Sequence, residues 1–480
     1  MNYGIIRYVL GWIIKVEGLL MLLPAMVALV YREKAGFSFL ICAWISIVVG
    51  ILLSYKKSAD KSFYAREGFI TVALGWIIMS LIGATPFYIS GEIPSYLDAF
   101  FEIVSGFTTT GASILSDVEA LSKCMLFWRS FSHWIGGMGV LVFVLAVLPM
   151  SGGESLHFMR AESPGPSVSK LVPKMRHTAG ILYVIYTGMM LVEIVLLVFS
   201  GMPVFDALCL SFGSAGTGGF AILNSGLATY TTLQQGIITV FMFLFGVNFS
   251  FYFLLLMRRG REAFSIEEVK WYFVIYMSVV LLITWNVSSS MGGNPLMNFH
   301  HAAFQVSSVM TTTGYSTLDF DLWPSFSKIL MVLVMFIGAC AGSTGGGIKV
   351  SRILIYVKSI KKEFSSLVHP RSIKVLKMDN KKIEHTVLRS ANVFLCTYAI
   401  VFFVSLIVIS LDNFDFETNF TAIVATLNNI GPGLAGVGPT KNFGGFSNLS
   451  KLVLSFNMLA GRLELFPMLL LFIPSTWRRK

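Results

Sequence analysis

The chain has 480 residues, of which 55% are hydrophobic and only 13% are charged, and its formal net charge is +11. A soluble domain carries about 25% charged residues, so much of this surface does not face water and the composition argues against a soluble enzyme. Because one helical crossing of a bilayer takes roughly 20 apolar residues, the chain has room for about ten crossings and is interpreted as a polytopic membrane protein.

Apolar runs bounded by charged or turn residues predict ten membrane spans. In chain order they cover residues 4–30, 37–54, 68–90, 124–149, 178–200, 235–257, 271–290, 326–357, 390–411 and 452–473. The first run carries Lys15 and Glu17, and no clear cleavage site follows it, so a retained helix is expected rather than a signal peptide. The five cysteines are scattered singly, which indicates neither a disulfide framework nor a zinc site.

The content of Lys and Arg alternates sharply from one connecting segment to the next. Most of the 36 basic residues fall near 56–66, 160–176 and 258–270, in 349–389, and in the tail 478–480. The other long gaps contain a single basic residue, Lys441, among them; they are 91–122, 201–230, 290–325 and 412–448. The positive-inside rule places the basic set and both termini in the cytoplasm and the other gaps outside. The net charge is then explained by topology, and no nucleic-acid partner is expected.

The four outer gaps share one pattern. Each is about 30 to 40 residues long, which is too long for a simple helix connection, and too apolar for a solvated loop. Their centres read DAFFEIVSGFTTTGAS (98–113), DALCLSFGSAGTGGFA (206–221), HAAFQVSSVMTTTGYS (301–316) and TNFTAIVATLNNIGPG (418–433). Each joins a short apolar helix to a polar, glycine-containing extended turn, so the chain is interpreted as a fourfold repeat of span, half-helix and span.

Such turns have a specific use inside a membrane. Non-helical backbone at that depth is tolerated only where protein buries it or where it lines a water-filled path. Four turns around one axis would supply carbonyl oxygens that replace the hydration shell of a cation, and glycine permits the backbone angles needed. A single TTTG could reflect glycines that merely allow close helix packing, but four matched repeats favour a pore. The turns are shorter than the TVGYG filter of potassium channels, so less strict potassium selectivity is expected.

These motifs resemble those of the Trk/Ktr/HKT superfamily of potassium transporters over nearly the whole chain. TTTGA, GTGGF, TTTGY and NNIGPG resemble its filter motifs, and WRSFSHWIGGMG (128–139), GSTGGGIK (342–349) and NMLAGRLELFP (457–467) resemble other family stretches. The two additional N-terminal spans favour the bacterial TrkH type over the Ktr type. In relatives whose first filter glycine is a serine, the resemblance implies greater sodium permeation, so Gly111 points to potassium.

The resemblance implies an all-α polytopic membrane protein of about ten transmembrane helices, with four span–pore helix–span units around a pseudo-fourfold pore. The expected parts are residues 1–66 (two extra spans), 67–175, 176–266, 267–385 (with an intramembrane gate loop) and 386–480. The filter residues expected to bind potassium are Thr109, Thr110, Gly111, Thr217, Gly218, Gly219, Thr312, Thr313, Gly314, Asn429, Ile430 and Gly431.

The resemblance also implies partners and a location. A homodimer with one pore per subunit is expected in the bacterial inner membrane, together with a cytoplasmic nucleotide-binding regulatory subunit. Segment 349–389 is the expected docking surface, because it is long, basic and continuous with the expected gate. Plain topological anchoring, or attraction to anionic lipid, is the alternative. No cofactor is expected in this chain, and potassium is the transported ligand.

The eighth predicted span is interrupted by GACAGSTGGGIK (338–349). Glycine costs roughly 1 kcal/mol in a helix interior, so these glycines predict a break. By resemblance, the loop lies beneath the filter and obstructs the pore until regulation moves it. Its residues are Gly342, Ser343, Thr344, Gly345, Gly346, Gly347 and Lys349. Similarity to a nucleotide-binding P-loop fails, because Ile348 separates Gly347 from Lys349 and the following residue is neither Ser nor Thr.

Arg462 lies near the middle of the last predicted span. A central Arg costs on the order of 2.5–3.5 kcal/mol on insertion scales, so it usually faces protein or water. By resemblance, it restrains the ion or the gate below the filter. The alternative is an Arg paired with a carbonyl or acid of a neighbouring helix. Glu464 points to a different helical face and is a poor partner.

Other charged residues receive simpler interpretations. Arg129, Lys328 and Lys451 are expected near outer ends of spans, where long basic side chains reach the interface. His133, His300 and His301 lack metal-ligand spacing and are assigned no chemistry. Glu102, in the first pore helix, could add negative potential to the pore mouth or be a buried hydrogen-bonded acid.

Three classes of function compete. The predicted function is potassium uptake through a selective, gated pore, and the alternative is a symporter that couples potassium entry to sodium or protons. A carbonyl filter is compatible with both. A membrane-embedded enzyme is disfavoured, because the sequence shows no paired His ligands, catalytic acids or cofactor motif.

Overall fold

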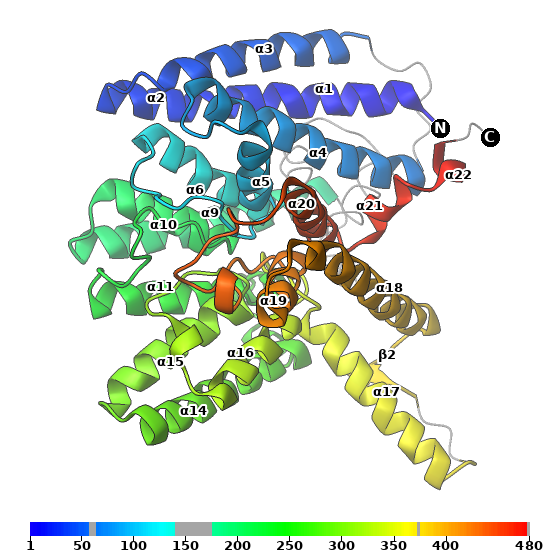
Figure 1. The fold of residues 1–480 in the computed structure, drawn as a ribbon. Coiled ribbons are helices and arrows are strands. Elements are labelled where there is room, and N and C mark those ends of the chain that lie inside the picture. Colours follow the sequence, from blue (N-terminus) through cyan, green and yellow to red (C-terminus); the bar gives the residue numbers. More distant parts are fainter. Residues whose placement is uncertain (57–63, 140–174, 372–374, 478–480) are drawn as a thin grey trace.

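The computed structural model describes residues 1–56, 64–139, 175–371 and 375–477. Helices dominate these residues, and the strands among them form one short hairpin (Figure 1). The second half of the predicted span 124–149 lies outside the described residues, and so do parts of the basic segments 56–66 and 160–176.

The helices follow the predicted order of two extra spans and four units. The N-terminal part contains α1 (Tyr3–Leu20), α2 (Leu22–Tyr31) and α3 (Gly36–Ser54). The first and second units contain α4 (Ala65–Ser90), α5 (Tyr96–Phe107) and α6 (Lys123–Gly137), then α9 (Met175–Phe199), α10 (Val204–Gly216), α11 (Thr232–Phe245), α12 (Phe249–Leu256) and α13 (Gly260–Ala263). The third contains α14 (Glu267–Met291), α15 (Pro295–Met310), η1 (Phe320–Leu322), α16 (Ser325–Ile337), α17 (Val350–Val368), β1 (Lys377–Met378) and β2 (Lys381–Lys382). The fourth contains α18 (His385–Ile409), η2 (Ser410–Asp412), α19 (Phe416–Leu427), η3 (Ala435–Val437), α20 (Asn448–Arg462), α21 (Phe466–Leu470) and α22 (Pro474–Trp477).

The N-terminal helices α1 and α3 lie against each other on one side of the bundle (Figure 1, blue). Small residues bring them together: a Cβ added at Gly11 would lie 2.8 Å from the Ser54 backbone nitrogen, and one at Gly18 would lie 2.9 Å from the Ser46 side chain. Close approach through small residues is how helices gain packing contacts in lipid, where the hydrophobic effect does not drive them together.

Six helices among the described residues are long and apolar enough to cross a membrane. They are Tyr3–Tyr31, Gly36–Ser54, Ala65–Ser90, Gly180–Phe199, Glu267–Met291 and His385–Asp412, which are the two extra spans and the first helix of each unit. Their outward faces are apolar, as Trp44, Trp285 and Ile407 show with 69%, 65% and 70% of their surface exposed. The prediction of an all-α polytopic membrane protein is confirmed.

In the second and fourth units the second helix differs from the unbroken spans expected there, 235–257 and 452–473. α11 and α12 meet at a bend of 91°, and α20 ends at Arg462, followed by two residues with positive φ. The predicted break after α16 is present at Gly338, which has a φ of 69°. At the ends of α6 and α20 the backbone approaches a pore helix closely: Gly136 and Gly461 leave no room for a Cβ against the carbonyls of Phe107 and Leu427, at the ends of α5 and α19.

Helix α17 and the hairpin of β1 and β2 project from one end of the bundle (Figure 1). The Lys358 ammonium of α17 connects this helix to the hairpin and to α14. It donates to the Glu267 carboxylate of α14 at 2.6 Å and to the Lys377 carbonyl of β1 at 2.7 Å. The predicted span 326–357 therefore ends in an amphipathic helix that runs on to Val368. The first and last described helices, α1 and α22, also meet, because the Tyr3 hydroxyl donates to the Trp477 carbonyl at 2.9 Å.

Candidate functional site

The four half-helices α5, α10, α15 and α19 end in the same backbone motif. In each, a residue just past the helix, the second after α10 and the third after α5, α15 and α19, donates its N–H to the carbonyl five residues earlier. These bonds are Thr110 to Ser105 (2.8 Å), Gly218 to Gly213 (2.8 Å), Thr313 to Ser308 (2.8 Å) and Ile430 to Ala425 (2.9 Å). The preceding residue is left-handed each time, with φ of 56° at Thr109, 56° at Thr217, 62° at Thr312 and 57° at Asn429. This is the Schellman termination, repeated fourfold.

The left-handed positions are unusual because three of them hold threonine. A β-branched residue at positive φ is strained, and such strain persists only where the surrounding structure enforces it. The Thr217 hydroxyl donates to the Gly216 carbonyl at 2.6 Å, and the Asn429 amide donates to the Thr110 hydroxyl at 2.9 Å. Within the described residues the buried Thr109 hydroxyl has no hydrogen-bond partner. We refer below to residues 108–111, 216–219, 311–314 and 428–431 as the four turns.

The glycines of the four turns close a ring, because each leaves room for the backbone of the next turn. A Cβ at Gly111 would lie 2.6 Å from the Gly219 nitrogen, and one at Gly219 would lie 2.5 Å from the Thr313 carbonyl oxygen. A Cβ at Gly314 would collide with the Ile430 carbonyl, and one at Gly431 would lie 2.8 Å from the Thr110 carbonyl oxygen. The contacts run from the first unit through the fourth and back to the first.

Two cavities lie near the turns, and of the two the outer one is lined by turn residues. An outer cavity of about 150 Å³ is lined by all four turn glycines and by the segments that follow them. An inner cavity of about 90 Å³ is lined by the loop 342–349, by Gly137 and by residues 461–464. The pore helices end at this ring, so the negative ends of their dipoles favour a cation there. The sequence-predicted filter residues are therefore brought together.

The loop 338–349 lies directly against the third and fourth turns. The Gly346 N–H donates to the Thr312 hydroxyl at 2.6 Å, which gives the strained threonine a partner. A Cβ at Gly345 would lie 2.8 Å from the Thr311 carbonyl oxygen, and one at Gly346 would lie 2.5 Å from the Asn428 carbonyl oxygen. Gly345 and Gly346 are therefore required for this close approach.

Both ends of the loop are held by one carboxylate. Glu268, on α14 and 3% exposed, accepts from the N–H of Ala341 at 2.7 Å and from the N–H of Ser351 at 3.0 Å. The Lys349 ammonium, 2% exposed, donates back to the Gly345 carbonyl. No sequence pattern singles out Glu268, because it lies far from the loop in the chain.

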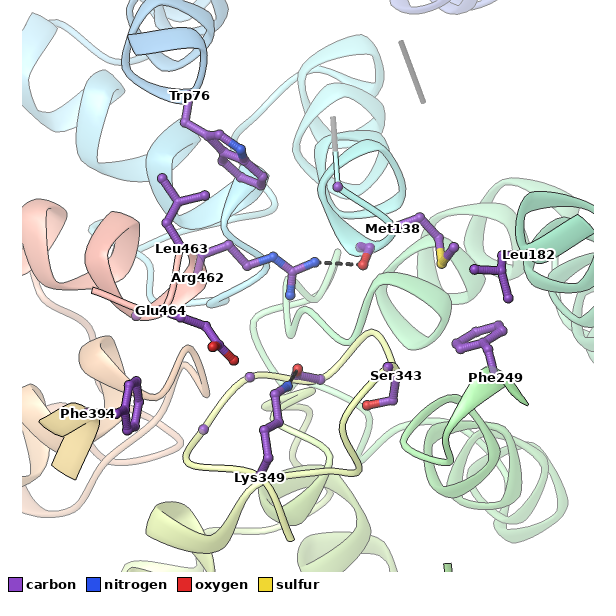
Figure 2. A pocket seen from close by; sticks show the side chains of 17 residues that line it. Trp76, Met138, Leu182, Phe249, Ser343, Lys349, Phe394, Arg462, Leu463 and Glu464 are labelled. Atoms are coloured by element: carbon purple, nitrogen blue, oxygen red, sulfur yellow. Dashed lines mark hydrogen bonds between the residues drawn. The ribbon is translucent and has the colours of Figure 1, made fainter. Parts of the chain in front are cut away.

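Arg462 connects this loop to the first unit. Its guanidinium donates to the Thr344 carbonyl at 2.8 Å and to the Gly136 and Gly137 carbonyls at 2.5 and 2.6 Å. Figure 2 shows Arg462, Lys349 and Glu464 around the inner cavity. Arg462 lines the cavity, and it is bound by carbonyls of neighbouring segments, as the alternative interpretation expected; a role in restraining the ion or the gate stays a prediction. Glu464 pairs with Arg352 of α17 at 2.5 Å rather than with Arg462.

The interpretation of two basic residues as interfacial anchors is wrong. Arg129 is 1% exposed and pairs with Glu102 at 2.7 Å, and Lys451 is 6% exposed and pairs with Asp98 at 2.6 Å. Glu102 is a buried, hydrogen-bonded acid, which is one of the two interpretations that its sequence position allowed. An opposite charge in the first pore helix was the available signal for both pairs.

Comparison with known proteins places the chain in a family. The family model TrkH, described as a cation transport protein, matches residues 35–479. The Trk system potassium uptake protein TrkH of Escherichia coli (strain K12) is 36% identical over 100% of both chains, and the Trk system potassium uptake protein TrkG of the same organism is 32% identical over 99% of this chain and 98% of its own. The crystal structure of the potassium transporter TrkH from Vibrio parahaemolyticus superimposes with a TM-score of 0.89 at 32% identity, covering 100% of both chains. The chain belongs to the TrkH family of cation transport proteins.

Proposed function

We propose that this protein takes up potassium across the bacterial inner membrane through a selective, gated pore. The observation that carries this proposal is the closed ring of four turns, with two cavities near it. Relatives of full length bear the name potassium uptake protein. The filter is formed by Thr109 to Gly111, Thr217 to Gly219, Thr312 to Gly314 and Asn429 to Gly431, whose backbone oxygens replace the water shell of the ion.

The loop 342–349 is the gate in this proposal. It is supported by the contact between Gly346 and the Thr312 hydroxyl, which sets the loop against the filter. Arg462 is the restraint, because it ties the Thr344 carbonyl to the Gly136 and Gly137 carbonyls of the first unit. Moving the loop would require breaking these bonds, so the gate is expected to be closed at rest.

Regulation and assembly follow from the same proposal. Both termini are assigned to the cytoplasm, an assignment supported by the contact of Tyr3 with Trp477 and by the distribution of basic residues. A cytoplasmic nucleotide-binding subunit would dock on 349–389, where α17 leads directly from the gate loop. The protein is assigned as a homodimer with one pore per subunit.

Tracer uptake tests the proposal. Purified protein in liposomes should take up ⁸⁶Rb⁺, a potassium substitute, and excess external K⁺ should compete far better than Na⁺. Uptake should follow the imposed potassium gradient at clamped voltage without added sodium or pH gradient, whereas a strict requirement for either gradient would favour the symport alternative. Equal competition by Na⁺ and K⁺ would contradict the filter.

A further inference from the structure

Within the first four residues after the turn glycine, the segment that leaves the turn toward the outside is tied back to its own pore helix in three of the four units; in the second unit the bond to the pore helix, from the Tyr230 hydroxyl to Asp206 at 3.0 Å, comes later. The ties are Ile114 N–H to the Glu102 carboxylate (3.0 Å), Gln305 amide to the Leu318 carbonyl (3.1 Å) and Leu434 N–H to the Thr421 hydroxyl (2.9 Å). Glu102 and Gln305 precede their turn glycines by the same interval. In the second unit that position holds Leu210, whose side chain has no hydrogen-bonding atom.

Helix α6 of the first unit supplies the missing tie. The Arg129 guanidinium donates to the Ala221 carbonyl at 3.3 Å and lies 4.1 Å from the centre of the Phe220 ring. One helical turn later, the His133 Nε2 accepts from the Phe220 N–H at 3.2 Å. Phe220 and Ala221 directly follow the second turn glycine, so both contacts act on the backbone where it leaves the ring.

The same two side chains hold the first unit. Arg129 Nη2 lies 2.7 Å from Glu102 and 3.4 Å from the Ser113 hydroxyl, while Glu102 also accepts from that hydroxyl at 2.9 Å. His133 Nδ1 lies 2.8 Å from the Gly106 carbonyl. Because a carbonyl can only accept, Nδ1 carries the hydrogen and Nε2 is the acceptor for Phe220, which fixes a neutral imidazole in one orientation.

We propose that Arg129 and His133 are positioning residues that set the second turn against the first, with Glu102 orienting Arg129, and thereby set potassium-over-sodium discrimination. This inference rests on the proposed function of the turns as the filter. The planar guanidinium suits the task, since its fork of donors bonds a carboxylate and a carbonyl at once, which a lysine ammonium at the same place does not reproduce.

A matched ion pair separates positioning from general stability. Asp98, on the same pore helix α5, pairs with Lys451 of α20 at 2.6 Å, but this pair contacts no residue of the segments that follow the turn glycines among the interactions of the described residues. Asp98→Asn therefore removes a part-buried ion pair of the same pore helix without releasing those segments. Arg129→Lys keeps the charge opposite Glu102 and removes the fork.

The test compares ⁸⁶Rb⁺ and ²²Na⁺ uptake by purified variants in liposomes. Arg129→Lys should lower the Rb⁺-to-Na⁺ uptake ratio about tenfold, the factor expected from losing one hydrogen bond to a charged group, while Asp98→Asn keeps the wild-type ratio. His133→Leu, which removes the acceptor for Phe220 at similar volume, should shift the ratio in the same direction and serves if Arg129→Lys does not fold.

Gly111→Ser, measured in parallel, distinguishes failure of the positioning role from failure of the filter assignment. If Gly111→Ser changes the ratio but folded Arg129→Lys and His133→Leu do not, the positioning role is overturned and the filter stands. An equal fall in Asp98→Asn would also overturn it, because any lost ion pair would then suffice. If Gly111→Ser leaves the ratio unchanged as well, the filter assignment itself fails.

Discussion

Replacing Arg462 tests whether the loop 342–349 is held shut from the last unit. Arg462→Ala removes the donor to the Thr344 carbonyl and the donors to the Gly136 and Gly137 carbonyls. Only the first of these bonds restrains the loop. A hydrogen bond from a charged group contributes about 1.5–3 kcal/mol net, so the ratio of open to closed loop should rise roughly 10- to 150-fold.

The assay is basal ⁸⁶Rb⁺ flux into liposomes without any regulatory subunit. Arg462→Ala should raise the flux, up to the point where the open state dominates and the increase saturates. Arg462→Lys keeps the positive charge but cannot bond all three carbonyls, so an intermediate rise is expected. Arg259→Ala is the control, since it removes an exposed arginine whose ion pair with Glu262, at 2.6 Å, lies outside the inner cavity.

The two variants also separate restraint from electrostatic repulsion. If Arg462 acted only as a positive charge opposing the ion, Arg462→Lys would keep the wild-type flux while Arg462→Ala raised it. The reasoning is refuted if well-folded Arg462→Ala, eluting as wild type on size exclusion, shows wild-type basal flux.

Three further changes have defined outcomes. Thr312→Val removes the hydroxyl that accepts from the Gly346 N–H at 2.6 Å and leaves that N–H buried, so basal Rb⁺ flux should rise about tenfold; unchanged flux would show that the loop does not depend on this contact. Deleting residues 343–347 should make flux independent of a regulatory subunit in the same assay, and flux that stays tightly gated would reject the gate. Hydrogen bonds from Thr418 hold the pKa of the Asp415 carboxyl below its ordinary value of 3.8, so this cap of α19 stabilises the fold above that pH and loses its effect as pH falls below it. Asp415→Ala should therefore cost about 1 kcal/mol in thermal unfolding at neutral pH and less at about pH 3, and an equal cost at both would contradict the assignment.

The sequence predicted the architecture well because its strongest signals are local. Long apolar runs identified the two extra spans and the first helix of each unit, and the fourfold recurrence of a half-helix with a glycine located the four turns. Even the break after α16 followed from glycine content alone. Each of these inferences needs only neighbouring residues, which is why they held.

The breaks in the other second helices could not be predicted in this way. α20 ends at Arg462 with Glu464 and Leu465 at φ of 55° and 69°, although neither residue favours that conformation. What enforces the turn lies elsewhere in the chain: Gly461 approaches the Leu427 carbonyl, and Glu464 pairs with Arg352 across 112 residues. Hydropathy alone indicates a continuous apolar segment there.

The positions of the paired charges could not be predicted for a related reason. A place near a span end suggests that Arg129 and Lys451 reach the membrane interface, yet each pairs with a carboxylate of α5, fully buried for Glu102 and part-buried for Asp98. Glu268 was passed over because its partners, Ala341 and Ser351, come from a distant loop. A carboxylate that accepts backbone N–H groups leaves no signature in the sequence.

The location of the transported ion tests the central claim most directly. Crystals of this protein soaked in Rb⁺ or Tl⁺ would show the ion by its anomalous scattering. We expect this density on the axis of the ring formed by Gly111, Gly219, Gly314 and Gly431. It should be absent from crystals soaked in Na⁺ instead of Rb⁺ or Tl⁺, and it should be weaker in Gly111→Ser. Density confined to the inner cavity beside Glu464, with none in the ring, would contradict the account.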